Sequence, residues 1–524
     1  MIIDYYYPDD EWEGVGYPHV YYRYRRADGG VIEHTINPNE NSDIDDPLQQ
    51  RIWIPPHCWV AENTHPKKLS RLTARYPGVR VRSDIKAKGI DKASLIRLDV
   101  PNPIHLYDIK SEIQTYEADM PYADQLMIHA YPDNKDIPDF HPRIWYFDME
   151  WQPEGCPHEG AITMISIDDT MGNRPLIFAW KEGEKGCTID YIEREGGYDR
   201  YLYGSEQKML DAFLKHLNKC NPDILIAHAI YWADLPKLVE RLGNKADKLS
   251  PLGQTVRPRK KDGYHDNAQP ILGRLVYDTA LAWNTGSGLE AVWQKNGRGT
   301  FRNKKLATIA EDLELAKELG EQGKKMDADV FTWWVENFDE FVDYCVRDTT
   351  LLRHCAEKVN AIPYHLAMQK ECGVVFKSTC NVSRFVRGRI SRHTDIKALT
   401  THYHQRDQYD GADVPETVGG RHEGVACIDF KSMYPLIAYN ANLCPTTKQK
   451  NGGDGIRSVG NGTHWRKEAS GIGVIPAIIW GMLELRQDYK KKMKAAKSED
   501  EKLKWDLLQT AVKVATNAIY GYMS

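Results

Sequence analysis

Four carboxylates and one tyrosine are spaced so that they could form a single metal-dependent site. Asp148 and Glu150 lie two residues apart in Ile144–Trp151, a predicted strand, so both side chains project from the same face. Two like charges in an apolar, aromatic segment are costly to bury unless a cation lies between them, and carboxylate oxygens suit Mg²⁺ or Mn²⁺. The alternative is an edge strand whose acidic face meets solvent.

A helix predicted from Phe338 to Val359 adds two groups to this set. Asp348 lies within the apolar stripe of the helix, one turn after Tyr344. A hydroxyl and a carboxylate on one inward face can hold and deprotonate a water beside a metal. Asp234 precedes another predicted helix and is compatible with either a metal ligand or a helix N-cap.

A second constellation begins at Asp429, which ends a strand predicted over residues 425–429. Ser432, Met433, Tyr434 and Pro435 then turn the chain into a helix. Backbone N–H groups at such a turn bind anions, the carboxylate could share a metal with triphosphate oxygens, and the Tyr434 ring could lie under a sugar. The alternative is a purely structural strand end.

Two long helices, predicted over residues 476–496 and 502–522, form a hairpin with a charged turn. The first helix carries Arg486, Lys490 and Lys494 at four-residue spacing. The second presents Lys513, Asn517 and Tyr520 along one face. These rows are either solvated faces or a site that grips an anion.

The elements between residues 144 and 359 must position the first set. Strands are predicted at 144–151, 161–167, 176–180 and 224–227, with helices between and after them, which indicates an α/β sheet covered by helices.

The whole chain has 524 residues and a formal net charge of −5, so several domains are expected and no overall basic character. Ten cysteines without a Cys-x-x-Cys pair indicate neither a zinc ribbon nor a disulfide framework. The absence of a leader pattern and of a membrane-length apolar run predicts a cytoplasmic protein that does not enter membranes.

In chain order, Asp148-Met-Glu150, Asp234 with its following Leu-Pro, and Tyr344-x-x-x-Asp348 resemble the three exonuclease motifs of family B DNA polymerases. The resemblance implies a ribonuclease-H-like 3′–5′ exonuclease domain that uses two metal ions. Asp148, Glu150, Asp234 and Asp348 would be the metal ligands, and Tyr344 would orient the attacking water.

The second exonuclease motif departs from the family pattern. It has Ala229 and Ala233 where the family usually has Asn and Phe. Since that Asn normally helps to hold the primer end, the expectation is that Tyr231 or His228 substitutes for it, or that editing is weakened.

Asp429-x-x-Ser432-Met433-Tyr434-Pro435 and Lys513-x-x-x-Asn517-x-x-Tyr520-Gly521 resemble the family's palm and fingers motifs, with Met433 in place of Leu. The resemblance implies that Asp429 binds the catalytic metals, again two Mg²⁺ or Mn²⁺, and that Tyr434 excludes a ribose 2′-OH. The same resemblance implies that a set of residues binds the incoming dNTP. This set comprises Tyr434 together with Ser432, Met433, Arg486, Lys490, Lys513, Asn517 and Tyr520.

Three glycines are expected to lie along the DNA. Gly419-Gly420 resembles the end of the family's linker motif, with Thr417 at its usual Tyr position. The resemblance also implies that Gly521 would face the nascent base pair. The resemblance covers roughly residues 140–524.

The expected fold is multidomain α/β. Its parts are an N-terminal domain (1–138, completed by about 365–415), the exonuclease domain (139–364), the first part of the palm (416–475) and the fingers helices (476–524). The family's second palm aspartate and its thumb have no counterpart after Gly521. We therefore expect one subunit of a split polymerase in a prokaryotic or phage-infected cell. It would act on primer–template DNA and need a second polypeptide that carries the remaining palm and thumb. The alternatives are a stand-alone 3′–5′ exonuclease with a vestigial polymerase half, and a non-catalytic DNA-binding scaffold.

Overall fold

The computed structural model describes most of the chain. The described residues are 1–7, 17–38, 52–257, 270–282, 301–315, 329–393, 396–400, 416, 419–426, 428–430, 432–458 and 462–523. They divide into two compact units. The first comprises Met1–Ile54, Pro121–Arg392 and Asp488–Ala515, and the second comprises Pro55–Met120, His393–Gln487 and Thr516–Ser524.

The first unit is built around a seven-stranded mixed sheet with the strand order β10-β11-β9-β8-β7-β12-β13. Its strands are β7 (Ile144–Trp151), β8 (Ile162–Asp169), β9 (Leu176–Trp180), β10 (Cys187–Ile192), β11 (Tyr198–Tyr203), β12 (Ile224–Ala227) and β13 (Leu275–Asp278). β7 pairs antiparallel with β8 and parallel with β12, so it is an inner strand. β8 and β12 are buried along their whole length, as expected of strands covered on both faces.

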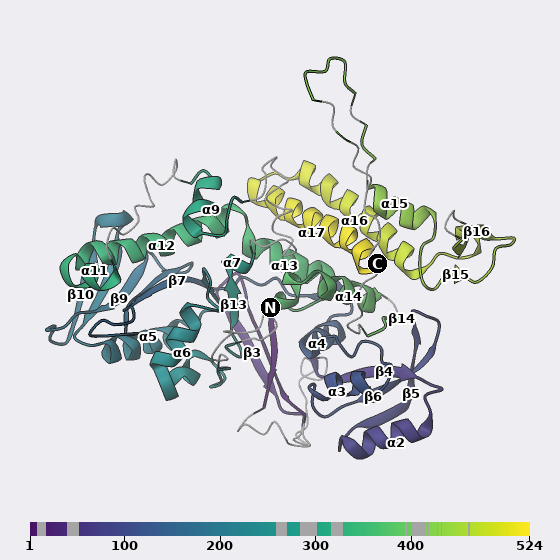
Figure 1. Cartoon of the computed structure of the whole chain (residues 1–524), viewed down its shortest axis with the longest axis horizontal. Coiled ribbons are helices and arrows are strands. Elements are labelled where there is room, and N and C mark those ends of the chain that lie inside the picture. The colour runs from purple at the N-terminus through teal and green to yellow at the C-terminus, as the bar shows by residue number, and fades with distance from the viewer. Residues whose placement is uncertain are drawn as a thin grey trace. The chain divides into compact units, whose positions relative to one another are not determined.

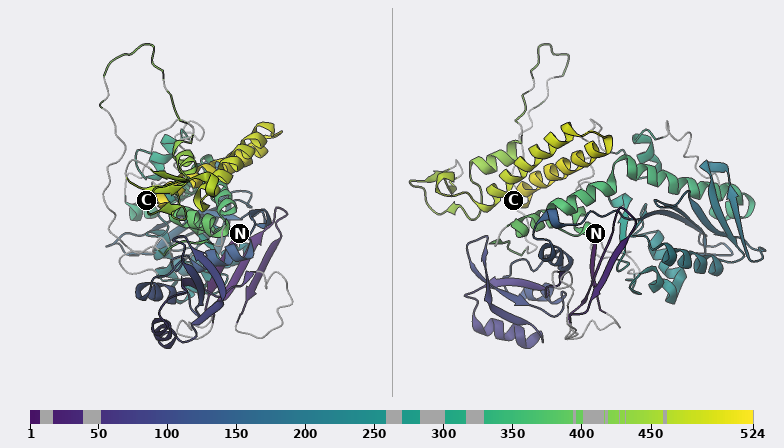
Figure 2. Two further views of the ribbon diagram at one scale, coloured as in Figure 1. Left: turned by 90° about the vertical axis from the view of Figure 1, so that its right-hand side faces the viewer. Right: turned by 180° about the vertical axis from the view of Figure 1, so that it is seen from behind.

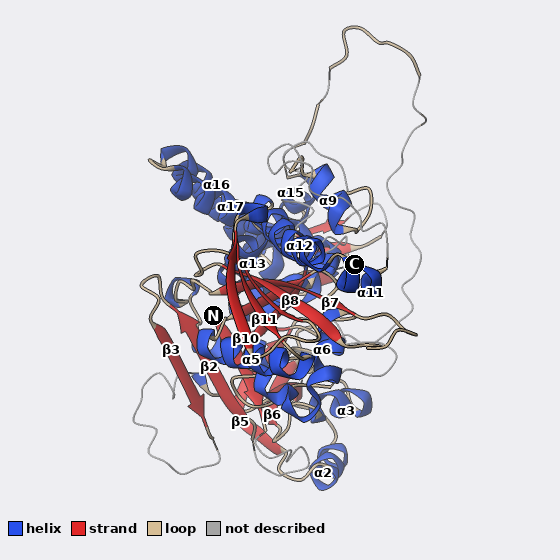
Figure 3. Ribbon diagram, turned by 90° about the vertical axis from the view of Figure 1, so that its left-hand side faces the viewer, coloured by secondary structure: helices blue, strands red, loops and turns tan. Residues whose placement is uncertain are grey.

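Helices cover both faces of this sheet. α12 (Phe338–Lys358) crosses one face against β7 and β8, while α5 (Glu206–Cys220) and α6 (Asp234–Leu242) pack on the other (Figures 1 and 3). α5 begins at Ser205, whose hydroxyl accepts the Lys208 N–H, and it ends at Asn221 in the left-handed conformation. The apolar side chains of these helices and of the inner strands form one core.

A smaller antiparallel sheet, β1-β2-β3, completes the N-terminal part of the first unit. The further elements of this unit are β1 (Ile2–Tyr6), β2 (His19–Arg25), β3 (Val31–Ile36), α4 (Tyr122–Ala130), α7 (Thr279–Ala282), α9 (Leu306–Asp312), α11 (Val330–Glu336), α13 (Ala361–Cys372) and α14 (Val382–His393). α9 ends at Asp312, and residues 316–328 lie outside the described part of the chain.

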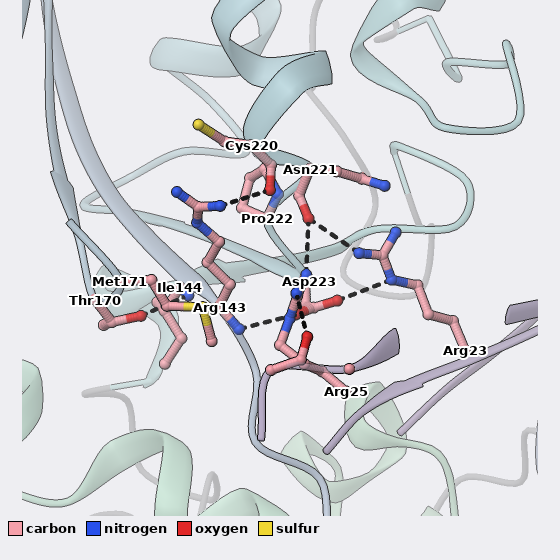
Figure 4. Close-up of polar contacts among 12 residues, drawn as sticks. Arg23, Arg25, Arg143, Ile144, Thr170, Met171, Cys220, Asn221, Pro222 and Asp223 are labelled. Carbon is pink, nitrogen blue, oxygen red and sulfur yellow. Dashed lines mark hydrogen bonds and ion pairs between the residues drawn. The ribbon is translucent and has the colours of Figure 1, made fainter. Parts of the chain in front are cut away.

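A buried ionic cluster joins the two sheets of the first unit (Figure 4). Arg23 and Arg25 of β2 both pair with Asp223, just before β12, at 2.9 and 2.6 Å. The backbone N–H of Arg143 donates to the same carboxylate at 2.8 Å, and Arg23 also donates to the Asn221 carbonyl at 3.0 Å. Asp223 is fully buried, so removing its carboxylate would leave the buried Arg23 and Arg25 guanidinium groups without their shared counter-ion, at a cost of roughly 3–5 kcal/mol. The cluster fixes where β7 and β12 begin.

The second unit contains a four-stranded sheet with the order β14-β5-β6-β4 and a three-stranded sheet with the order β15-β17-β16. Its elements are β4 (His57–Ala61), α2 (Pro66–Arg75), β5 (Arg80–Gly89), β6 (Ser94–Asp99), α3 (His105–Glu112), β14 (Ile396–Lys397), α15 (Met433–Asn440), β15 (Lys448–Gln449), β16 (Ile456–Ser458) and β17 (His464–Arg466). The chain returns at residues 396–400 to pair with the segment before Met120. β14 joins β5, and the Thr115 hydroxyl donates to the Thr400 hydroxyl at 2.9 Å.

The predicted hairpin of long helices is confirmed. α16 (Val474–Ala495) and α17 (Glu499–Met523) run side by side (Figure 2). The rings of Tyr489 and Trp505 lie 5.6 Å apart between them, and the Lys492 ammonium lies 4.9 Å from the Trp505 ring centroid.

The prediction of a strand over residues 425–429 is wrong, because the described residues of that segment form no strand. Val425 and Ile428 are 74% and 84% exposed, respectively. A strand forms only when a neighbour pairs its backbone and covers its apolar face, and none of the described strands pairs with this segment. The described helices include none with the length and apolarity needed to span a bilayer.

Candidate functional site

The two carboxylates of β7 lie inside the main sheet. Because β7 has neighbours on both sides, the edge-strand alternative for Asp148 and Glu150 is wrong. The two residues face Ser166 and Met164 of β8, respectively, and share one face of the strand. Cys345 of α12 lies with its Sγ 3.9 Å from Asp148 Oδ2, so the helix packs directly over this face.

α12 brings Tyr344 and Asp348 to the same face, and the Tyr344 hydroxyl hydrogen-bonds the Asp348 carboxylate. A hydrogen bond and an ion pair fix the rotation of the helix. The Tyr198 hydroxyl donates to Asp343 at 2.6 Å, and Arg347 Nε donates to Glu195 at 3.1 Å. The buried half of α12 therefore presents the predicted tyrosine and carboxylate toward β7.

Asp234 is the first residue of α6. The N-cap is Ala233, and it makes no side-chain capping bond. The Asp234 Oδ2 atom is buried and has no hydrogen-bond partner among the described residues. The N-cap alternative is therefore wrong. An unpartnered buried carboxylate oxygen is the group that a cation or a bound ligand satisfies.

The four carboxylates influence one another strongly. Burial raises the pKa of Asp148 well above its ordinary value, and the charges of Glu150, Asp234 and Asp348 raise it further. Burial and the last two charges raise the pKa of Glu150 to about 8, and burial raises the pKa of Asp234 to about 7. Burial also raises the pKa of Asp348 to about 6, against the lowering effect of the Tyr344 hydrogen bond.

No group of three or more His, Cys, Asp or Glu side chains is arranged to hold a metal ion within the described ranges. What favours a divalent cation is therefore the type of donor atoms and not their arrangement. The donor set is four mutually repelling carboxylates, one with an unpartnered oxygen, and hard oxygen donors of this kind suit Mg²⁺ or Mn²⁺.

The turn between β12 and α6 contains Tyr231 and His228, the two residues expected to replace the Asn of the family's second exonuclease motif. The Tyr231 hydroxyl donates to the Val276 carbonyl at 2.9 Å, and the ring is buried. The two ring nitrogens of His228 contact Thr279 Oγ1 at 3.0 Å and the Lys304 carbonyl at 2.7 Å. Both side chains make hydrogen bonds within the fold, and the expectation that one of them substitutes for the missing Asn stays a prediction. Trp232 in the same turn is 47% exposed.

Asp278 is a residue of this region that sequence reasoning missed. It ends β13, and its buried carboxylate accepts the N–H groups of Ala229 and Tyr231 at 3.0 and 3.2 Å. It also accepts those of Ala280 and Leu281 at 2.9 and 3.4 Å. The available signal was a carboxylate directly after an apolar strand, the same pattern that drew attention to Asp429.

In the second constellation, Asp429 is exposed and Ser432 precedes α15 in the left-handed conformation, with φ 54°. Pro435 lies in the first turn of the helix, as predicted. Met433 and Tyr434 are exposed at that end of α15. The structure thus places a carboxylate just before a helix start whose side chains face outward.

The cationic residues lie on the hairpin. Arg486 and Lys490 are half-buried on α16, and burial lowers the pKa of Arg486. Lys513 and Asn517 are exposed, one turn apart on α17.

The remaining predicted positions are glycines and residues at the margins of the described chain. Gly521 is helical, while the side chain of Tyr520 and residue Thr417 lie outside the described part. A side chain added at Gly419 or Gly420 would meet no atom within 4 Å, which leaves this backbone open to a ligand.

Comparisons with known proteins agree with the resemblance. The model of the family described as DNA polymerase family B matches residues 348–524. A DNA polymerase of Thermococcus gorgonarius is 25% identical over 500 residues, 87% of this chain and 58% of the relative. A DNA polymerase of Pyrococcus glycovorans is 27% identical over 431 residues, 78% of this chain and 50% of the relative. The chain thus spans about half the length of the curated relatives it matches.

Structural comparison gives the same result for the fold. The solved structure of the family B DNA polymerase from the archaeon Pyrobaculum calidifontis superposes with a TM-score of 0.72 at 19% identity. The superposition covers 100% of this chain and 67% of that one. The mixed α/β, multidomain fold is therefore shared.

Proposed function

We propose that this chain, a relative of the family B DNA polymerases, supplies a 3′–5′ exonuclease site and one half of a nucleotidyl-transfer site. The exonuclease proposal rests on one observation above all. Asp148 and Glu150 from an inner strand and Asp348 from α12 are half-buried, Asp234 from α6 is buried, and the four carboxylates lie close enough for the charges of three to raise the pKa of Asp148. Together with the order of the motifs, this arrangement supports a ribonuclease-H-like nuclease domain over residues 139–364.

The chain's own groups have distinct roles in the proposed trimming reaction. The carboxylates would hold two Mg²⁺ or Mn²⁺ ions, which supply an activated water and stabilise charge on the phosphate. Tyr344, hydrogen-bonded to Asp348, orients that water toward the terminal phosphodiester. Trp232 offers an exposed aromatic face on which the terminal base of a single strand can stack.

The proposed synthesis site uses Asp429 as a metal ligand and the start of α15 as a triphosphate site, with Ser432 and Met433 there and Tyr434 beneath the sugar. Arg486, Lys490 and Lys513 grip the dNTP phosphates, Asn517 supports them, and Tyr520 faces the base pair. Gly419, Gly420 and Gly521 leave room for the DNA.

We propose that a complementary polypeptide pairs with the segment before α15 and contributes to the synthesis site. Two-metal phosphoryl transfer needs a further carboxylate beside Asp429. The described segment that precedes α15 also leaves Val425, Ile428 and Phe430 more than 70% exposed. Such a run of apolar side chains is suited to pairing with a further strand.

The exonuclease proposal is tested by trimming of a single-stranded oligonucleotide with Mg²⁺. Asp148→Ala should reduce trimming by at least 10³-fold, because the remaining carboxylates cannot assemble the metal site without it. Glu154→Gln, which changes an exposed acid on the following loop, is the matched control and should trim normally. Unchanged trimming in the Asp148→Ala chain would exclude this site.

The synthesis proposal is tested by primer extension with this chain alone and after mixing with a polypeptide that carries a second palm aspartate and a thumb. We expect extension only after mixing, and Asp429→Ala should abolish it. Trimming without extension in any mixture would favour a stand-alone exonuclease, and loss of both activities would favour a scaffold.

A further inference from the structure

We propose that Asp278 is a positioning residue for the metal ligand Asp234, acting by clamping the turn between β12 and α6. This inference rests on the proposed exonuclease function. It assigns to the site a carboxylate that none of the three recognised motifs contains.

The topology places Asp278 beside the turn. β13 runs parallel to β12, with Asp278 in register with Ala227, so both strands end at the same edge of the sheet. The Asp278 carboxylate then reaches across to the N–H groups of Ala229 and Tyr231. With its other bonds to Ala280 and Leu281, it joins the turn that leads to Asp234 to the first turn of α7.

The turn has a specific need for such a clamp. Ala229 has a φ of 71°, a left-handed conformation that is unfavourable for alanine. The alanine side chain carries no polar group of its own that could hold this conformation. The stabilising bond comes instead from Asp278, and His228 adds a second tie to Thr279 next to it.

Asp234 depends directly on this geometry. The Ala229 carbonyl accepts the Ala233 N–H at 2.9 Å, and the Ile230 carbonyl accepts the Leu235 N–H at 3.1 Å, so the turn sets the start of α6. The unpartnered Asp234 Oδ2 lies at that start. If the turn relaxes, this oxygen moves relative to Asp148 and Glu150 on β7, and the metal site loosens.

The test is a titration of the full chain with Mn²⁺, in which the electron paramagnetic resonance signal of the free ion gives the dissociation constant. Asp278→Asn keeps the size of the side chain but replaces one acceptor oxygen with an NH₂ group. That NH₂ group would face a backbone N–H, so one hydrogen bond of the clamp is lost. We expect the Mn²⁺ affinity to fall about tenfold or more. The Michaelis constant for DNA should stay near that of the unchanged protein.

Asp124→Asn is the matched control. Asp124 is also a buried carboxylate that accepts a backbone N–H, from Val375 at 2.8 Å, but it lies on α4. This variant should bind Mn²⁺ normally. Equal Mn²⁺ affinity in the Asp278→Asn chain and the unchanged chain would overturn the inference while leaving the exonuclease proposal intact. If the unchanged chain neither binds Mn²⁺ nor trims DNA, both fail.

A second measurement needs no variant and so does not depend on how a variant folds. In the unchanged chain, the amide hydrogens of Ala229 and Tyr231 should exchange with solvent as slowly as those of the neighbouring inner strands, because Asp278 holds them. Exchange at the rate of an open loop would contradict the clamp.

Discussion

At the residue scale, the side chains that the sequence singled out differ in how firmly their surroundings fix them. Asp234 could be predicted only as a ligand or an N-cap, because both roles place a carboxylate at the start of a helix. The structure makes Ala233 the N-cap of α6, which excludes the second role, and the ligand role stays a prediction that the unpartnered Asp234 oxygen supports. Asp278 could not be ranked above other strand-end carboxylates, since its four N–H donors come from two separate turns that only the parallel pairing of β12 with β13 brings together.

Trp232 gives a prediction that separates DNA binding from metal binding. Stacking of a base on an aromatic ring contributes about 1–3 kcal/mol. Trp232→Ala should therefore raise the Michaelis constant for a single strand about tenfold in a trimming assay, with little change in the rate at saturation or in Mn²⁺ affinity. Tyr107→Ala, at an exposed aromatic residue on α3, should have no effect. An unchanged Michaelis constant in the Trp232→Ala chain would remove Trp232 from the substrate path.

At the element scale, α4 is tied to the residues that follow α13 through Asp124. Its carboxylate accepts the Val375 N–H and the Ser378 hydroxyl at 2.8 and 2.6 Å, and burial raises its pKa to about 6. A carboxyl whose pKa is raised by folding stabilises the folded state most below its unfolded pKa, and this contribution is lost as the pH rises through the folded pKa.

The stability of the unchanged chain relative to Asp124→Asn should therefore fall by about 2 kcal/mol between pH 4 and pH 7, and then stay constant. Urea unfolding of both proteins across this range, followed by fluorescence, measures the difference. The altered hydrogen bonds of the Asn variant change its free energy of unfolding by the same amount at every pH. The result is therefore read from how the difference between the two proteins changes with pH. A flat or rising difference would show that Asp124 is not buried as described.

The sequence predicted those elements whose local pattern and tertiary role agree. β7, β9 and β12 have the predicted bounds, and α5, α6 and α12 follow their apolar stripes. β10 and β11 were missed because β10 is mostly exposed and β11 places charged residues between its tyrosines, so neither strand gives a clear apolar alternation. β13 was missed because its sequence, Leu-Val-Tyr-Asp, ends in a tyrosine and a carboxylate and so lacks the uniform apolar run that marked the equally short β12. The strand at 425–429 shows the reverse case, in which a strong apolar pattern lacks a neighbouring strand.

At the scale of the whole molecule, the exonuclease residues all belong to the first unit, whereas Asp429 and α15 belong to the second. The site within a single unit is the one whose carboxylates the structure brings together. The predicted domain bounds, including the N-terminal domain over 1–138, remain predictions.

The exposed apolar segment before α15 gives a prediction about assembly. Ile428→Asp places a charge where we propose that a further strand pairs, so it should abolish primer extension after mixing with a complementary polypeptide. Because Ile428 is 84% exposed, the same change should leave trimming and the melting temperature unaffected. Glu423→Gln, at an exposed acid of the same segment, is the control. Normal assembly of the Ile428→Asp chain would place the interface elsewhere.

The central claim is that carboxylates from β7, α6 and α12 act as one metal-dependent nuclease centre. The most direct measurement is the single-turnover rate of 3′ trimming, with Mg²⁺, for Asp148→Ala, Asp348→Ala and the double variant. Residues that act as a unit lose their contribution together, so the double variant should be no more than a few-fold slower than either single variant. Losses that multiply in the double variant, or trimming that persists in either single variant, would contradict the claim.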